Sequence, residues 1–173
     1  MFNYRPVFCF DDALFGNNFL ITNPGEMMIG KTVEELKIGE TAEFTKTITE
    51  HDVYAYAGIT GDFNPAHINE VYAEKTFFKG RIAHGMLSAG LISTIIGTQL
   101  PGAGAIYLKQ ELKFTAPVRF GDTITARVEV IDIVKARNRL RLKTVCINQD
   151  GDKVIDGEAL ISPPKAPCRV TLR

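Results

Sequence analysis

The sequence predicts an α+β protein in which a curved antiparallel sheet wraps around one long buried helix. Residues 84–100 carry apolar side chains on every side of the expected helix, which is typical of a helix surrounded by protein. The chain after residue 104 alternates polar and apolar residues in short segments joined by turns, which is typical of antiparallel strands. A sheet that curls around a central helix lets both parts bury their apolar faces.

Composition fits one globular domain that binds neither nucleic acid nor membrane. The 173 residues are 45% hydrophobic, and 20 basic side chains balance 20 acidic ones, so the basic excess of a typical nucleic-acid binder is missing. No apolar run reaches the roughly 18 residues of a membrane span. Cys9, Cys146 and Cys168 are odd in number and widely spaced, which favours a reducing compartment over a disulfide framework. Asp11 and Asp12 interrupt the N-terminus too early for a signal peptide, so we expect a cytoplasmic protein.

Three parts are expected along the chain. Residues 1–30 are rich in Phe, Asn and Gly without clear periodicity, and they form an N-terminal extension of unknown role. Residues 31–165 form a single domain, and residues 166–173 form a C-terminal tail.

The domain is expected to begin with a strand and a capped helix. Residues 42–49 alternate and are rich in Thr, which predicts a strand. Thr49 followed by Asp52 is a variant of the capping box, so we expect a helix over 50–60 that ends at Gly61 in a left-handed conformation. A second, short helix is predicted over 69–78.

The remaining strands are predicted from alternation. The strand within 104–118 is expected to place one set of residues on one face: Ile106, Leu108, Gln110, Leu112 and Phe114. Further strands are predicted over 123–134 and 138–148. Asp150-Gly151 predicts a hairpin into a last strand over 153–161.

Asp62 and His67 are the first candidates for chemistry. Gly61 lets the preceding helix end, while Pro65 fixes its own φ and keeps Asn64 out of helical geometry. The two side chains therefore leave one short, restrained loop, which acid–base catalysis needs because a misplacement of about 1 Å can cost about 100-fold in rate. If the loop is buried, the acid and the imidazole can exchange roles. The same pattern also occurs in ordinary turns that end helices, so a structural role stays open.

His84 and Gly85 stand where the buried helix is expected to begin. The N-terminus of a helix presents free backbone N–H groups and a partial positive charge. A glycine there lets a carbonyl approach closely, so this position is a candidate oxyanion hole. Packing for Gly85 and a polar helix start for His84 are the structural alternatives.

Other polar clusters give weaker signals. His51, His67 and His84 show no metal-ligand spacing, so we expect no metal site, and His51 is interpreted as a solvated side chain in the first turn of a helix. Residues 136–143, ARNRLRLK, are basic, but their alternation predicts a solvated strand face, with contact to a phosphate as the alternative.

The segment YAGITGDFNPAHINEVYAEKTFFKGRIAHGM resembles the hydratase 2 motif of the MaoC-like (R)-specific enoyl-CoA hydratases, and the similarity covers about residues 33–161. This resemblance implies the hot-dog fold, a curved antiparallel sheet around a long central helix. It also implies that Asp62 and His67 are the catalytic pair and that the Gly85 N–H polarises the thioester carbonyl. Supporting roles are implied for Asn64, Ser93 and His84.

The activity implied by the resemblance is reversible syn addition of water to trans-2-enoyl-CoA, giving (R)-3-hydroxyacyl-CoA. Coenzyme A is then part of the substrate, no cofactor or metal is needed, and a homodimer or higher homo-oligomer is expected. One alternative is a 3-hydroxyacyl dehydratase that acts on an acyl-carrier-protein or branched acyl-CoA thioester. Another is a non-catalytic hot-dog module that binds acyl thioesters. Acyl chain length, physiological direction and the identity of the base stay open.

Overall fold

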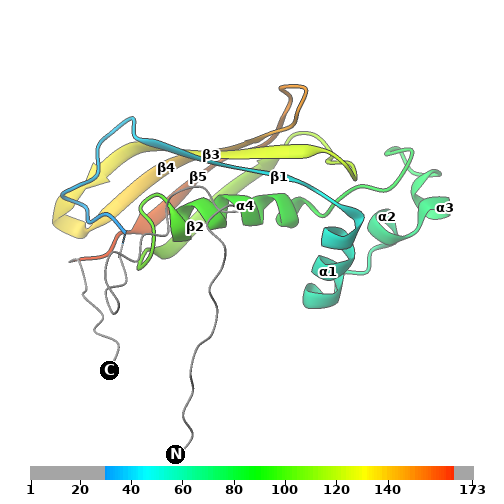
Figure 1. Cartoon of the computed structure of the whole chain (residues 1–173), viewed down its shortest axis with the longest axis horizontal. Helices are drawn as coiled ribbons and strands as arrows, with labels where there is room; N and C mark the ends of the chain where they lie inside the picture. The colour runs from blue at the N-terminus through cyan, green and yellow to red at the C-terminus, as the bar shows by residue number, and fades with distance from the viewer. Residues whose placement is uncertain (1–29, 166–173) are drawn as a thin grey trace, which may run out of the picture. The chain divides into compact units, whose positions relative to one another are not determined.

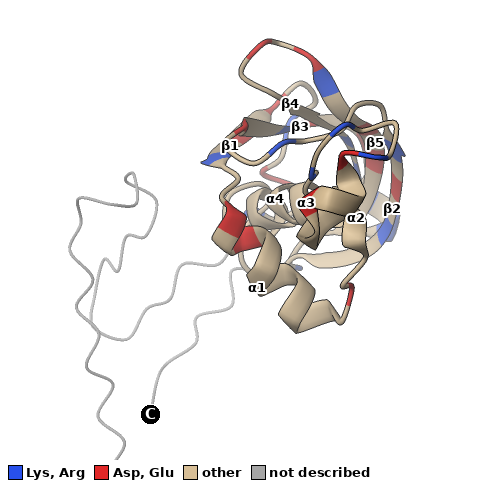
Figure 2. Cartoon of the chain, turned by 90° about the vertical axis from the view of Figure 1, so that its right-hand side faces the viewer, with Lys and Arg blue, Asp and Glu red and all other residues tan. Residues whose placement is uncertain are grey.

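A computed structural model describes residues 30–165, so the predictions for residues 1–29 and 166–173 lie outside the described residues. One five-stranded antiparallel sheet, in the order β1-β3-β4-β5-β2, curls around helix α4 (Figures 1 and 2). This arrangement confirms the predicted α+β class. The elements are β1 (Thr41–Thr47), α1 (Glu50–Thr60), α2 (Pro65–Ile68), α3 (Glu70–Ala73), α4 (Gly85–Thr98), β2 (Ile106–Phe114), β3 (Thr123–Val134), the 3-10 turn η1 (Lys135–Arg137), β4 (Arg139–Ile147) and β5 (Lys153–Ser162).

Local signals place most of these elements where the sequence predicted them. Thr49 and Asp52 form a reciprocal capping box at the start of α1, and Gly61 ends that helix with a φ of 78°. Gly151 has a φ of 87° in the hairpin between β4 and β5. Within residues 30–165 no helix is long and apolar enough to cross a bilayer.

The core lies between α4 and the inner face of the sheet. Helix α4 carries no charged residue and contacts β3, β1 and β4, while acidic and basic residues lie on the outer face of the sheet (Figure 2). Fully buried side chains come from both layers: Ile92, Ile95, Ile124, Val128, Leu140, Leu142 and Ile161. Burial of these side chains supplies the main stabilisation of the domain.

Helix α4 is not buried all round, which corrects the prediction from its composition. Gly90, Ser93 and Gly97 are exposed, and Met86 is 54% exposed. The helix lies over β1, β3 and β4, so its opposite side and the inner face of β2 stay uncovered in one chain.

A β-bulge at Leu108 changes the predicted face of β2. Tyr107 pairs with Ile161 and Gln110 pairs with Ala159, so Tyr107 takes the place expected for Ile106 on the inner face. One extra residue in a strand reverses the alternation beyond it. The Tyr107 hydroxyl accordingly donates a hydrogen bond to Gln110.

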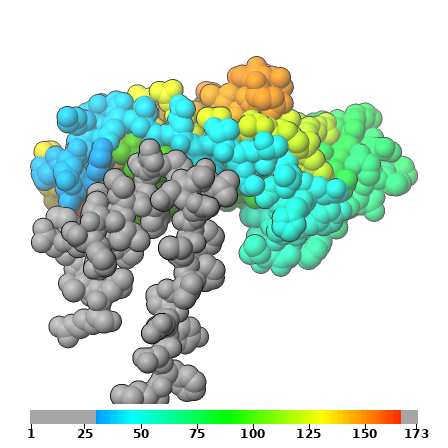
Figure 3. All heavy atoms as spheres, viewed as in Figure 1, coloured from blue at the N-terminus to red at the C-terminus, as the bar shows by residue number. Residues whose placement is uncertain are grey.

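Two short helices differ from prediction. Pro65–Ile68 forms α2, where a loop was expected, and α3 covers only Glu70–Ala73 of the predicted 69–78. The Thr76 hydroxyl donates to the carbonyl of Ala73 at 2.6 Å, which satisfies a carbonyl at the end of α3. Helices α1 to α3 gather at one end of the sheet, shown teal to green in Figure 3.

Candidate active site

Asp62 follows α1, two residues after the last residue of that helix, Thr60. Its Oδ1 accepts the backbone N–H of Asn64 at 3.2 Å, which fixes the carboxylate beside the turn. The side chain is 52% exposed, so the burial considered from the sequence is not met within one chain. Asn64 adopts an extended ψ of 126° and caps α2, because its Oδ1 accepts the N–H of Ala66 at 3.0 Å.

His67 lies on α2 and is half-buried. Its Nδ1 lies 2.8 Å from the carbonyl oxygen of Ile82. A carbonyl only accepts hydrogen bonds, so the neutral ring carries its proton on Nδ1 and leaves Nε2 as an acceptor. The contact holds the imidazole in one tautomer and one orientation.

His84 is the N-cap residue of α4 and is 3% exposed. Its Nε2 donates to the backbone carbonyl of Asp62 at 2.9 Å and lies 3.9 Å from Asp62 Oδ2. Its ring centroid lies 3.8 Å from that of His67 and 4.9 Å from that of Tyr56. The buried Nδ1 has no partner within residues 30–165. His84 therefore connects the turn of Asp62 with the ring of His67.

Gly85 is the first residue of α4, where backbone N–H groups have no partner inside the helix. Its N–H donates no hydrogen bond to any of the described residues. The ring of Phe114 occupies the space that a side chain would fill, since a Cβ built at Gly85 would lie 2.7 Å from Phe114 Cε1. Close approach of this ring thus explains the glycine.

Arg81 forms ion pairs with both α1 and α3, the helices on either side of the segment that carries Asp62 and His67. Its guanidinium contacts Glu50 of α1 at 2.5 Å and Glu70 of α3 at 2.9 Å. The hydrogen bonds to Glu50 and Glu70 raise the pKa of Arg81. Since Arg81 precedes the Ile82 carbonyl that orients His67, the ion pairs fix that carbonyl relative to α1 and α3.

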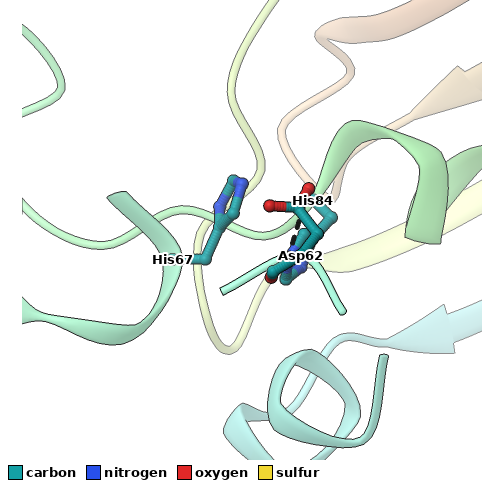
Figure 4. A group of neighbouring side chains, drawn as sticks. All are labelled: Asp62, His67 and His84. Atoms are coloured by element: carbon teal, nitrogen blue, oxygen red, sulfur yellow. Dashed lines mark hydrogen bonds and ion pairs between the residues drawn. The ribbon is translucent and has the colours of Figure 1, made fainter. Parts of the chain in front are cut away.

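One pocket of about 130 Å³ collects these groups: Tyr56, Thr60, Asp62, His67, His84, Gly85 and Met86. Figure 4 shows Asp62 and His84 close together, with His67 beside them. The sequence prediction named four of the lining residues and missed Tyr56, Thr60 and Met86. Tyr56 and Thr60 lie four residues apart on α1, so they share the helix face that ends at Asp62.

Asp62, His67 and His84 each offer one ligating atom, and these atoms lie within 4.8 Å of one another. This cluster has the composition of a divalent-metal site. Sequence spacing could not indicate it, because the fold brings His84, from the start of α4, to the short segment that carries Asp62 and His67.

Ser93 is not brought to this pocket within one chain. It is exposed on α4, eight residues after Gly85, which corresponds to about 12 Å along a helix. It makes no hydrogen bond with Asp62 in the described part of the chain. His51 is exposed on α1, as predicted.

Comparisons with known proteins show the family to which the chain belongs. The family description "MaoC like domain" matches residues 33–153. The chain is 53% identical over 131 residues to an (R)-specific enoyl-CoA hydratase of Rhodospirillum rubrum, covering 76% of this chain and 90% of that protein. It is 48% identical over 132 residues to a 3-hydroxybutyryl-CoA dehydratase of Methylorubrum extorquens, covering 76% and 83%. The solved structure of the unliganded R-hydratase PhaJ1 from Pseudomonas aeruginosa matches with a TM-score of 0.76 at 46% identity, covering 83% of this chain and 92% of that one.

Proposed function

The chain belongs to the MaoC-like family and has its hot-dog fold, and on this basis we propose that it is an (R)-specific enoyl-CoA hydratase. Such a hydro-lyase adds water reversibly to a trans-2-enoyl-CoA and gives the (R)-3-hydroxyacyl-CoA. The observation that carries the proposal is the meeting of Asp62, His67 and the free N–H of Gly85 in one pocket.

In the proposed reaction, one water molecule donates two hydrogen bonds, one to the Asp62 carboxylate and one to Nε2 of His67. Their ligating atoms lie within 4.8 Å of each other, which a single bridging water can span. The water oxygen forms a bond to the β-carbon as one of the two groups takes a proton. The pair then delivers one proton to the α-carbon on the same face, so the proton count balances.

The proposed role of Gly85 is to stabilise the enolate oxygen of the thioester. Its free N–H lies at the positive end of α4, where a developing negative charge is favoured. The thioester itself acidifies the α-position, so we propose that the reaction uses no metal or other cofactor, with coenzyme A only as part of the substrate.

The supporting residues act through position in this scheme. Asn64 donates its backbone N–H to the Asp62 carboxylate and starts the helix that carries His67. His84 holds the backbone of Asp62 and packs against the ring of His67. A role for Ser93 beside a catalytic Asp62 requires a second copy of the chain, because the two are far apart within one.

The test is hydration of crotonyl-CoA, followed by loss of the enoyl absorbance. Asp62→Asn removes the carboxylate, and His67→Asn keeps a donor for the Ile82 carbonyl but deletes Nε2. We expect each change to lower kcat by at least about 10³-fold, and the double variant to lose little more, since the two residues act as a unit. His51→Gln is the matched control and retains activity. A fully active Asp62→Asn protein would show that the pair is structural, and product chirality tests the (R) assignment.

The second candidate is a dehydratase that acts on an acyl-carrier-protein thioester. An acidic carrier protein would favour basic residues at the pocket, and none of the seven pocket-lining residues is Lys or Arg. We therefore expect a higher kcat/KM for crotonyl-CoA than for the carrier-protein thioester. The reverse ratio would favour the second candidate, and inactivity with both thioesters would favour a non-catalytic binding module.

We further propose that two chains form a dimer through β2 and α4. Strand β2 is a sheet edge, and it exposes Ile106 (61%), Leu108 (43%) and Phe114 (51%). A long apolar edge strand readily pairs with another chain. The pocket of about 130 Å³ is below the roughly 300 Å³ at which ligand sites begin, so a second chain would also complete its walls.

Leu108→Asp tests the dimer by light scattering after gel filtration. We expect this variant to be monomeric and poorly active, while Ile38→Asp, an equally polar change at another exposed apolar residue, stays dimeric. A dimeric Leu108→Asp protein would exclude this interface. A cytoplasmic location stays a prediction.

A further inference from the structure

A basic hollow of about 530 Å³ lies on the outer face of the sheet, where η1 joins β3 to β4. Its lining combines three guanidinium groups with two apolar side chains: Val134, Arg137, Arg139, Arg141 and Leu160. Nothing in the proposed hydration reaction uses these residues.

The strand register places four of the five on one face. Arg139 lies directly opposite Val134, and Arg141 lies directly opposite Leu160. Opposed residues of antiparallel strands point to the same side of the sheet. Their neighbours Leu140 and Leu142 are fully buried, so this face is the outer one. Arg137 closes the end of the hollow, because Asn138 turns the chain back with a left-handed φ of 50°.

The arginines are held in place, but their charge is only partly balanced. Arg139 Nη1 donates to the carbonyls of Arg137 and Asn138, both at 3.1 Å, which orients its guanidinium. Arg141 contacts Glu158 at 2.6 Å. Within residues 30–165 neither Arg137 nor Arg139 forms an ion pair. The oriented guanidinium of Arg139 and the exposed guanidinium of Arg137 therefore offer hydrogen-bond donors to an anion.

We propose that this hollow binds the phosphate-bearing part of a nucleotide. Oriented arginines recognise phosphate oxygens through paired, charge-assisted hydrogen bonds. Val134 and Leu160 supply an apolar floor, and a guanidinium plane can stack on a flat base. The volume lies within the range of small-molecule sites, so a whole nucleotide fits.

The hollow is separate from the pocket of the same chain. Strand β3 spans 12 residues, from Thr123 next to the start of α1 to Val134 beside the hollow. A strand of that length extends about 40 Å. Figure 1 shows the β3–β4 turn, in yellow, at the end of the sheet away from α1 to α3. The length of β3 exceeds that of an extended pantetheine arm, so one coenzyme A cannot reach from the pocket to the hollow of the same chain. The nucleotide in the hollow is therefore either a free nucleotide or the nucleotide end of a coenzyme A whose thioester lies in a neighbouring chain.

The experiment is calorimetric titration of the full-length protein with ADP at low salt. We expect Arg139→Gln to weaken ADP binding at least tenfold and Arg137→Gln, an exposed turn residue whose loss leaves the core intact, at least threefold. Arg127→Gln is the matched control, since Arg127 lies on β3 outside the hollow and pairs with Glu43 at 3.4 Å. We expect this control to bind ADP within twofold of the wild type, inorganic phosphate to compete with ADP, and adenosine not to bind.

Two kinetic comparisons distinguish the sources of the nucleotide. If Arg139→Gln raises KM for crotonyl-CoA but not for crotonyl-pantetheine, the hollow takes the nucleotide end of coenzyme A. If both KM values stay unchanged while ADP binding falls, the hollow takes a free nucleotide. The proposal is overturned if ADP does not bind at millimolar concentration, if adenosine binds as tightly as ADP, or if Arg127→Gln weakens ADP as much as Arg139→Gln does. Binding is read directly, so inactivity of the protein as a hydratase leaves this test intact.

Discussion

Replacing Gly85 by alanine tests whether the start of α4 positions the reacting thioester. The new Cβ would lie 2.7 Å from Cε1, 2.8 Å from Cδ1 and 3.3 Å from Cζ of Phe114. The shortest of these contacts falls about 0.7 Å below the 3.4 Å at which ordinary contact begins. Rotation of the ring about its Cβ–Cγ bond moves Cδ1 and Cε1 but not Cζ, which lies on that axis. The overlap therefore has to be relieved by rotation or displacement of the ring, by a shift of the start of the helix, or by both.

The expected loss of rate depends on how far the overlap with Phe114 displaces the backbone N–H of residue 85. The substitution keeps the backbone N–H, so any loss comes from displacement of the donor rather than from its removal. Because a misplacement of about 1 Å can cost about 100-fold, a shift of several tenths of an ångström predicts a 10- to 100-fold lower kcat. This range corresponds to roughly 1.4 to 2.7 kcal/mol of lost transition-state stabilisation.

The assay is steady-state hydration of crotonyl-CoA by Gly85→Ala, Phe114→Ala and the double variant. Removing the ring in Phe114→Ala makes room for the new methyl group, so we expect the double variant to recover most of the activity lost by Gly85→Ala, relative to Phe114→Ala alone. The reasoning is refuted if Gly85→Ala is fully active, which would mean that the exposed ring absorbs the whole shift. It is equally refuted if the double variant is no better than Gly85→Ala.

Three further predictions concern the same end of the sheet. His84→Phe keeps a ring but loses the donor to the Asp62 carbonyl, so it should lower kcat about 10- to 100-fold with little change in KM. His84→Gln keeps a donor and should lose less activity. Equal losses in the two variants would contradict a role for that hydrogen bond. Chelator treatment should leave activity within twofold, and activity that requires a metal would overturn the proposed mechanism. Added Zn²⁺ should inhibit reversibly by binding to Asp62, His67 and His84. Burial raises the pKa of Asp52 but the hydrogen bonds from Thr49 outweigh it, so this pKa lies below its ordinary 3.8. The stabilisation by Asp52 is therefore present above pH 3.8 and lost as pH falls below it. Asp52→Ala should lower the free energy of unfolding by about 1 kcal/mol at pH 7 and by less at pH 3. The same difference at both pH values would show that the Asp52 charge is not the source of the stabilisation.

The features that the sequence predicted correctly depend on neighbours along the chain. The capping box of Thr49 and Asp52 and the left-handed glycines at 61 and 151 are local signals, and all are present. Helix α2 carried a local signal too, since an asparagine cap followed by proline is a typical helix start, and its interpretation as a loop was wrong. The bulge at Leu108 had no such signal, because it is defined by pairing with β5.

Only part of the candidate pocket could be predicted, because contacts between distant segments leave no local signal in the sequence. Asp62 and His67 lie on one short segment, so their spacing was informative. His84 joins them from the start of α4 and Tyr56 from α1, and these contacts follow from tertiary packing. The metal-like cluster shows the difference most clearly, since its members have no ligand spacing in sequence and yet lie within 4.8 Å in space.

The wrong expectation for α4 is informative about assembly. One chain buries the large residues of α4 against β1, β3 and β4 and leaves exposed a side of small residues that includes Gly90, Ser93 and Gly97. Exposed apolar side chains are costly in water, and they include Met86 on α4 and Ile106, Leu108 and Phe114 on the edge strand β2. The dimer that we propose would cover both this side of α4 and the exposed residues of β2. If Leu108→Asp separates the copies, we expect the loss of activity to accompany the loss of the dimer, because Gly85 and Met86 line the pocket and are exposed in one chain.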